Sequence, residues 1–234
     1  MFLLLIFLLI HNLHVTFSLF KYTFFVPEVM EMRSKKTVII LAGGRSKRFH
    51  SSDKCFITLH HLPLIHHVID NIAAVADEII VAARDEEQGE EIRTIIPHKV
   101  ALAFDALNGF GPLAGFLSGL ERASFPCSLV VGCDMPFINE RVVDVLFEIA
   151  FTGYDAVVPR WENGMVEPLH AVYRREPMLA AIREAVGKGE GKILTALSQL
   201  KKVYFLPIDR IKGLDPSLRT FTNINTPEGL KRYD

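Results

Sequence analysis

Residues 41–54 (LAGGRSKRFHSSDK) form a loop that could hold the phosphates of a nucleotide. Gly43 and Gly44 lack a Cβ, so their backbone N–H groups can approach a phosphate closely. Three cations on the same loop add positive charge against a triphosphate: Arg45, Arg48 and Lys54. The spacing excludes a Walker P-loop and does not support a dinucleotide-binding G-x-G-x-x-G. The alternative is an ordinary glycine turn with solvated basic residues.

A single carboxylate, Asp134, follows an apolar run at the point where a buried strand would end. Mg²⁺ prefers oxygen ligands and is often bound by one or two carboxylates together with substrate phosphates. Asp134 is therefore a candidate magnesium ligand, and a helix cap or turn residue is the alternative.

Residues 109–115 (GFGPLAG) predict the start of a helix whose small residues would let a ligand approach closely. Tight packing of that helix on a sheet is the alternative, and the two interpretations are compatible. Asp105 lies shortly before this stretch, at the end of another apolar run. It is a second candidate for contact with a ligand.

From Lys36 onward, short apolar runs alternate with helical patterns, which predicts a mostly parallel sheet with helices on both faces. Ligands of such three-layer α/β folds bind beyond the carboxyl ends of the strands, where the loops above would lie. The expected strands are Thr37–Ala42, Glu78–Ala83, Val100–Asp105, Ser128–Gly132, Tyr154–Pro159, Val166–Tyr173 (crossing the active face) and Val203–Pro207. The expected helices are Pro63–Ala74, Glu87–Ile96, Pro112–Ala123, Asn139–Phe151, Glu176–Val186, Lys192–Leu200 and Thr226–Arg232. No repeat or linker divides residues 36–234, which predicts one domain there.

The composition limits the class of protein. With 234 residues, of which 50% are hydrophobic and 23% charged, the chain can bury a sizeable core. A formal net charge of −1 gives no general attraction to nucleic acid or to an anionic membrane. The three cysteines are odd in number and form no C-x-x-C pair, so we expect neither a disulfide framework nor a zinc site. A reducing, cytoplasmic location fits this pattern best.

Residues 1–35 form an apolar N-terminal extension with three possible interpretations. Residues 1–20 contain no Lys, Arg, Asp or Glu, which suits a membrane anchor, but His11, Asn12 and His14 interrupt the apolar run. A signal peptide would have a positive start and a small-residue cleavage site, and neither is present. A translation start assigned too far upstream is the third interpretation, because Met30 and Met32 precede the first clear strand. We expect a dispensable or mis-assigned extension and no membrane association.

Taken together, these motifs resemble those of the molybdenum cofactor guanylyltransferases, the MobA family of nucleotidyltransferases. The resemblance covers roughly Val38 to Arg232. The segments that carry it are LAGGRSKRFHSSDK (41–54), GPLAG (111–115), CDMPF (133–137), EPLHAVY (167–173) and FTNINTPE (221–228). Phe49-His50 departs from the pattern, since family members commonly carry Met-Gly at that point.

The resemblance implies a Rossmann-like nucleotidyltransferase fold and an Mg²⁺-dependent enzyme. That enzyme would transfer GMP from GTP to the terminal phosphate of molybdopterin, with or without bound molybdenum, and release pyrophosphate. The acceptor phosphate is already anionic, so no general base is expected, in keeping with the lack of a catalytic-histidine motif. Molybdoenzymes or cofactor-insertion proteins are the implied protein partners, and no nucleic acid is expected.

Site residues are carried over from the matching motifs. The implied catalytic residues are Lys54, Arg48 and Asp134, and Asp134 is also the implied metal ligand. The implied nucleotide-binding residues are Leu41, Ala42, Gly43, Gly44, Arg45, Lys54, Asp105, Gly111, Pro112, Asp134, Asn223 and Asn225. Two alternatives stay open: a cytidylyltransferase that acts on the same or another phosphorylated acceptor, and a non-catalytic nucleotide-binding protein of the same fold.

Overall fold

The computed structural model describes residues 34–44, 53–105, 107 and 109–233. The chain divides into two compact units, Met1–Lys35 and Lys36–Asp234. The first unit lies almost wholly outside the described residues, so our interpretation of it as a dispensable extension stays a prediction.

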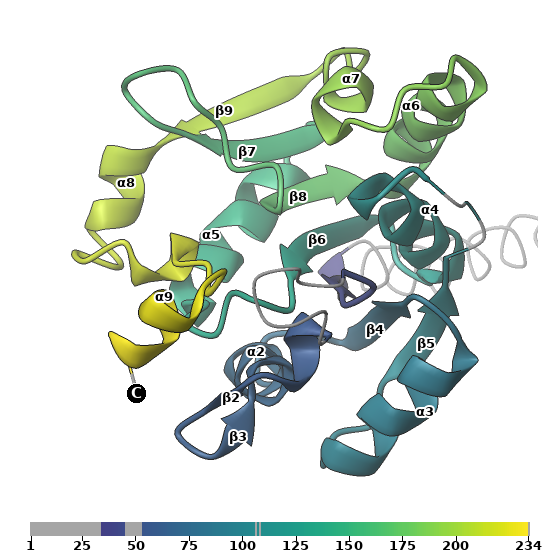
Figure 1. The fold of residues 1–234 in the computed structure, drawn as a ribbon. Coiled ribbons are helices and arrows are strands. Elements are labelled where there is room, and N and C mark those ends of the chain that lie inside the picture. The colour runs from purple at the N-terminus through teal and green to yellow at the C-terminus, as the bar shows by residue number, and fades with distance from the viewer. Residues whose placement is uncertain (1–33, 45–52, 106, 108, 234) are drawn as a thin grey trace, which may run out of the picture. The chain divides into compact units, whose positions relative to one another are not determined.

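A seven-stranded sheet in the order β5-β4-β1-β6-β8-β7-β9 forms the centre of the second unit (Figure 1). All neighbouring strands are parallel except β8, which runs antiparallel to both β6 and β7. A short hairpin, β2–β3, stands apart from this sheet. The strands are β1 Lys36–Leu41, β2 Thr58–Leu59, β3 Leu62–Pro63, β4 Glu78–Ala83, β5 Ala101–Phe104, β6 Cys127–Gly132, β7 Ala156–Arg160, β8 His170–Arg174 and β9 Val203–Pro207.

Helices cover both faces of the sheet (Figure 1). Successive side chains of a strand point to opposite faces, so Val38 and Ile40 of β1 join one apolar cluster and Ile39 joins the other. The first cluster includes residues of α2, α3 and α5, and the second includes residues of α4, α6 and α7. The helices are α2 Leu64–Ile72, α3 Glu86–Ile95, α4 Pro112–Arg122, α5 Glu140–Phe151, α6 Arg175–Gly187, α7 Ile193–Leu197, α8 Ile208–Lys212 and α9 Pro227–Lys231, with 3₁₀ turns at η2 Lys54–Phe56 and η3 Arg219–Phe221.

The three-layer, mostly parallel fold predicted from the sequence is confirmed, but one strand was wrong in its bounds and place. The sequence predicts a single strand across the active face at Val166–Tyr173. In the structure β8 begins only at His170 and lies inside the sheet, between β6 and β7. Pro168 cannot donate to a strand ladder, and Val166 forms only an isolated bridge with Arg160.

The chain also contains elements that the sequence did not predict, namely the β2–β3 hairpin and the short helix α8. Within the described part of the chain, every helix is too short or too polar to cross a bilayer.

Candidate active site

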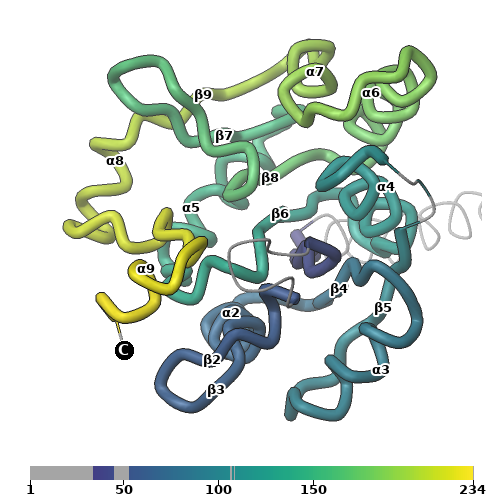
Figure 2. The backbone as a smooth tube through the Cα atoms, viewed as in Figure 1, coloured from purple at the N-terminus to yellow at the C-terminus, as the bar shows by residue number. Residues whose placement is uncertain are grey.

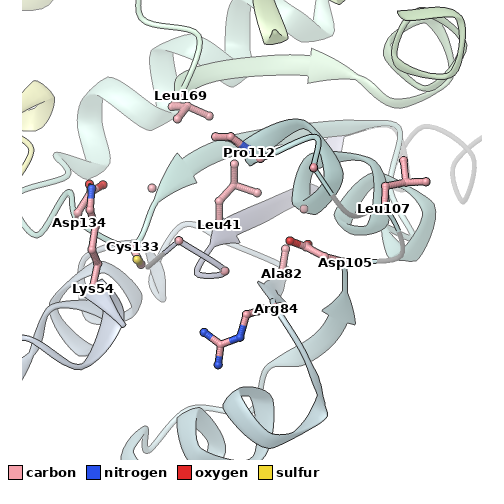
Figure 3. Close-up of a pocket in the computed structure, with 16 residues that line it drawn as sticks. Leu41, Lys54, Ala82, Arg84, Asp105, Leu107, Pro112, Cys133, Asp134 and Leu169 are labelled. Atoms are coloured by element: carbon pink, nitrogen blue, oxygen red, sulfur yellow. The ribbon is translucent and has the colours of Figure 1, made fainter. Parts of the chain in front are cut away.

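A pocket opens at the carboxyl end of the parallel strands (Figure 3). The strand register explains its position: Leu41 of β1 lies opposite both Ala82 of β4 and Gly132 of β6, so the loops that follow these strands leave the sheet at one level. The described lining residues are Leu41, Gly43, Gly44, Lys54, Ala82, Arg84, Asp105, Leu107, Gly109, Gly111, Pro112, Gly115, Gly132, Cys133, Asp134 and Leu169.

Most of the residues singled out from the sequence meet at this pocket. Eight of them line it: Leu41, Gly43, Gly44, Lys54, Asp105, Gly111, Pro112 and Asp134. Ala42 does not line the pocket: it is buried, and its N–H donates to the carbonyl of Ala82 at 2.9 Å. Arg45 and Arg48 lie outside the described residues, so their predicted roles stay predictions.

At one end of the pocket Lys54 and Asp134 form an ion pair (Figure 3). The Lys54 Nζ lies 2.9 Å from the Asp134 Oδ2 and also donates to the Oδ1 of Asn225. The C-terminal segment reaches this point because the N–H of Ile224 donates to the carbonyl of Asp134 at 2.8 Å, and Figure 2 shows the segment returning beside the end of β6. Asn223 instead donates its amide locally, to the carbonyl of Phe221 at 3.3 Å.

Asp105 lies at the other end of the pocket, in a close-fitting cradle (Figure 3). A Cβ on either Gly43 or Gly115 would lie 3.0 Å from one of its carboxylate oxygens, so any other residue there would push the carboxylate aside. Its Oδ1 is buried and has no hydrogen-bond partner among the described residues. Burial raises the pKa of this carboxyl to about 6. The Oδ1 of Asp105 is therefore a buried hydrogen-bond acceptor to which no described residue donates.

Two further polar residues bear on the pocket: Arg84 lines it, and the buried Gln88 bonds to the backbone of Arg84 and Ala42. Arg84 directly follows β4, as Asp134 nearly follows β6, so the strand-end rule that selected Asp134 could have selected it too. Gln88 on α3 is fully buried: its Oε1 accepts from the Arg84 N–H at 2.7 Å and its Nε2 donates to the Ala42 carbonyl at 3.1 Å. Nothing in its local sequence marks that role, because half of the residues of this helix are charged.

Cys133 also lines the pocket, but as an inert thiol. It is buried, and burial raises its pKa well above the usual value. The nucleophile in cysteine catalysis is the thiolate, so the position of Cys133 gives no basis for covalent chemistry here.

Replacing Gln88 with Met should destabilise the fold. The change keeps most of the side-chain volume but leaves the Ala42 carbonyl and the Arg84 N–H without this partner. The loss at the buried Ala42 carbonyl alone costs about 1–3 kcal/mol. Urea unfolding measures the loss. Gln199, the only other glutamine in the chain, is the matched control, because its Oε1 has no hydrogen-bond partner among the described residues. Equal losses in Gln88→Met and Gln199→Met would contradict the bridging role.

Comparisons with known proteins identify the family to which the chain belongs. A family model described as the MobA-like NTP transferase domain matches residues 38–203. A probable molybdenum cofactor guanylyltransferase from Methanosarcina mazei is 38% identical over 205 residues, which cover 86% of this chain and 91% of the relative. The molybdenum cofactor guanylyltransferase from Desulfosudis oleivorans is 32% identical over 198 residues, or 85% of this chain and 94% of the relative.

A solved structure is similar as well. The crystal structure of molybdopterin-guanine dinucleotide biosynthesis protein A from Archaeoglobus fulgidus superposes with a TM-score of 0.73 and 30% identity, and the match covers 84% of this chain and 96% of that one. The family model, the relatives and the solved structure all indicate one family, and the chain belongs to the MobA-like NTP transferase family.

Proposed function

We propose that this protein transfers GMP from GTP to the terminal phosphate of molybdopterin and releases pyrophosphate. The observation that carries the proposal is the pocket itself: a glycine loop, a lysine and a carboxylate meet at one strand edge, in a chain whose relatives are named for this reaction. GTP and molybdopterin are the proposed substrates. Three buried free cysteines support a cytoplasmic location.

We propose that Mg²⁺ is the cofactor and that Asp134 is its protein ligand. The donor set fits: Asp134 faces the pocket, and Mg²⁺ commonly takes one or two carboxylates and completes its shell with phosphates and water. Among the described residues, no group of three or more His, Cys, Asp or Glu side chains is placed to hold a metal ion. When bound, Mg²⁺ would neutralise phosphate charge.

The chain's own residues would position the triphosphate for in-line attack. The Gly43 and Gly44 N–H groups approach the phosphates, and the Lys54 ammonium neutralises the departing pyrophosphate. An oxygen of the acceptor phosphate attacks the α-phosphorus of GTP, and the bond from that phosphorus to the α–β bridging oxygen breaks. The attacking phosphate is an anion at neutral pH, so no side chain has to remove a proton.

Asp105 supports GTP over CTP. Guanine presents a ring N–H and an amino group side by side, and an ionised carboxylate can accept from both. Cytosine presents an amino group beside a ring nitrogen whose lone pair would face the second carboxylate oxygen. The buried, unpaired Oδ1 of Asp105 lies at the pocket end away from Lys54, where a base would lie if the phosphates sit at the Lys54 end. We therefore propose that Asp105 recognises the guanine.

This assignment predicts a pH dependence of GTP binding. Donors on guanine stabilise the ionised carboxyl, so bound GTP lowers the Asp105 pKa from the ligand-free value of about 6. Affinity should then rise as the pH rises towards that value, and level off above it. Titration of GTP on both sides of this pH checks the result. Asp105→Asn is the comparison, because the titration of GTP's own phosphates is common to both proteins; identical pH curves would contradict the assignment.

The deciding experiment measures pyrophosphate release with molybdopterin, with GTP or CTP, in the presence and absence of Mg²⁺. We expect metal-dependent release with GTP and much slower release with CTP. A preference for CTP would favour the cytidylyltransferase alternative. The absence of release with either nucleotide, despite tight binding, would favour a non-catalytic nucleotide-binding protein.

A further inference from the structure

We propose that Arg84 is a positioning residue for nucleotidyl transfer: through its ion pair with Asp53, it holds Lys54 where the lysine faces Asp134 and the pocket. This inference rests on the proposed function, because it takes Lys54 to act on the triphosphate. Three observations support it: the contacts that Arg84 makes, the way its backbone is fixed, and the charge balance around Lys54.

The guanidinium of Arg84 bridges two carboxylates. Its Nη1 donates to the Asp53 Oδ1 at 2.6 Å, and its Nε donates to the Asp85 Oδ2 at 2.7 Å. Asp53 immediately precedes Lys54, at the returning end of the phosphate loop. Between the described residues on the two sides of that loop, the Lys54 N–H donates to the Gly44 carbonyl over a longer distance, 3.5 Å. The Arg84–Asp53 pair is thus a short connection between the residue before Lys54 and the end of β4.

The backbone of Arg84 is held firmly enough for the side chain to act as an anchor. Its N–H donates to the buried Gln88, and Gly43 packs against its main chain so closely that a Cβ there would lie 3.4 Å from the Arg84 nitrogen. A rigid base matters because catalytic groups must be held to within a fraction of an ångström. Arginine suits the task better than lysine, since its planar fork fixes two acceptors at once.

The charge balance around Lys54 is the third observation that supports a role for the Arg84–Asp53 ion pair. Asp53 is an anion beside Lys54 in sequence, near a pocket that is to receive a triphosphate. Pairing with Arg84 neutralises Asp53 and leaves the Lys54 ammonium to Asp134 and Asn225. The hydrogen bonds to Asp53 and Asp85 raise the pKa of Arg84 above its already high value, so the anchor stays charged at every working pH.

A double-mutant cycle tests the proposal. Arg84→Met should lower kcat/KM for GTP roughly ten- to a hundredfold, as expected for loss of a charge-assisted pair, and Arg84→Lys should recover part of the loss. Because Arg84 acts through Lys54, Lys54→Ala should cost far less in the Arg84→Met background than in the native protein. Asp53→Asn should reproduce the effect of Arg84→Met, and the two changes together should cost little more than either alone.

The control is Arg93→Met on α3. Arg93 pairs with Glu90 at 2.6 Å, is exposed and lies outside the described pocket, so its loss should leave activity unchanged. Thermal melting of each variant separates misplacement from unfolding, and if Arg84→Met does not fold, the cycle uses Arg84→Lys and Asp53→Asn.

Independent, multiplying effects of Arg84→Met and Lys54→Ala would overturn the proposal and indicate that Arg84 contacts the phosphates directly. Native activity in Arg84→Met would overturn it as well. If the native protein binds GTP but does not turn it over, that result would count against the proposed function alone. The same double-mutant cycle, measured on the Kd for GTP with Mg²⁺, then tests whether Arg84 acts through Lys54.

Discussion

Replacing Asp134 with Asn should abolish metal-dependent release of pyrophosphate while leaving the fold intact. Asn has the same shape, and the main-chain bond from Ile224 to residue 134 does not involve the side chain. What is lost is the negative charge that would hold Mg²⁺, and a bound metal contributes several kcal/mol to phosphoryl-type transition states. We expect a fall in kcat/KM of at least about a hundredfold. Initial rates of pyrophosphate release from GTP measure it.

The control for this change is Asp144→Asn. Asp144 is also paired with a lysine, Lys36, at 2.6 Å, but it lies on α5 and does not line the pocket. Its loss should leave the rate unchanged. Near-native turnover in Asp134→Asn, with the usual metal dependence, would place the metal elsewhere.

Replacing Lys54 with Ala should lower kcat/KM for GTP by roughly ten- to a hundredfold or more. A charge-assisted contact contributes about 1.5–3 kcal/mol, and a contact that tightens in the transition state contributes more. Steady-state kinetics at varied GTP concentration separates an effect on KM from one on kcat.

Lys36→Ala is the matched control, because it removes another lysine from a pair with an aspartate, on the first strand but away from the pocket. If both lysine variants keep native kcat/KM, the Lys54 ammonium does not act on the triphosphate.

Much of this architecture could be predicted from the sequence because it depends on local pattern. The run TVIIL in β1 is apolar on both faces, which is typical of a strand covered on two sides, and the structure buries Val38, Ile39 and Ile40 completely. Asp134 and Asp105 each follow such a run, so the rule for ligand sites at strand ends was enough to place them at one pocket.

The features that escaped prediction depend on partners distant in sequence. Arg84 and Asp53 are 31 residues apart, and Gln88 and Ala42 are 46 apart, so neither contact has a local signature. Helix α8 has only five residues, too few to display a helical period. The position of β8 between β6 and β7 also escaped prediction, because the composition of a strand does not specify which strands it pairs with.

The place of the reversed strand β8 has a consequence for how this chain could diverge during evolution. All described lining residues of the pocket except Leu169 come from positions 41–134, before the reversal. Among the described residues, the hydrogen bonds between the Lys54–Asp134 pair and the chain after β8 come from the Asn225 side chain and the Ile224 main chain. The pocket lining thus belongs largely to the chain before β8, although β6 and β8 pair directly within one continuous sheet. Substitutions after β8 could therefore accumulate in a lineage while the residues that line the pocket stay the same.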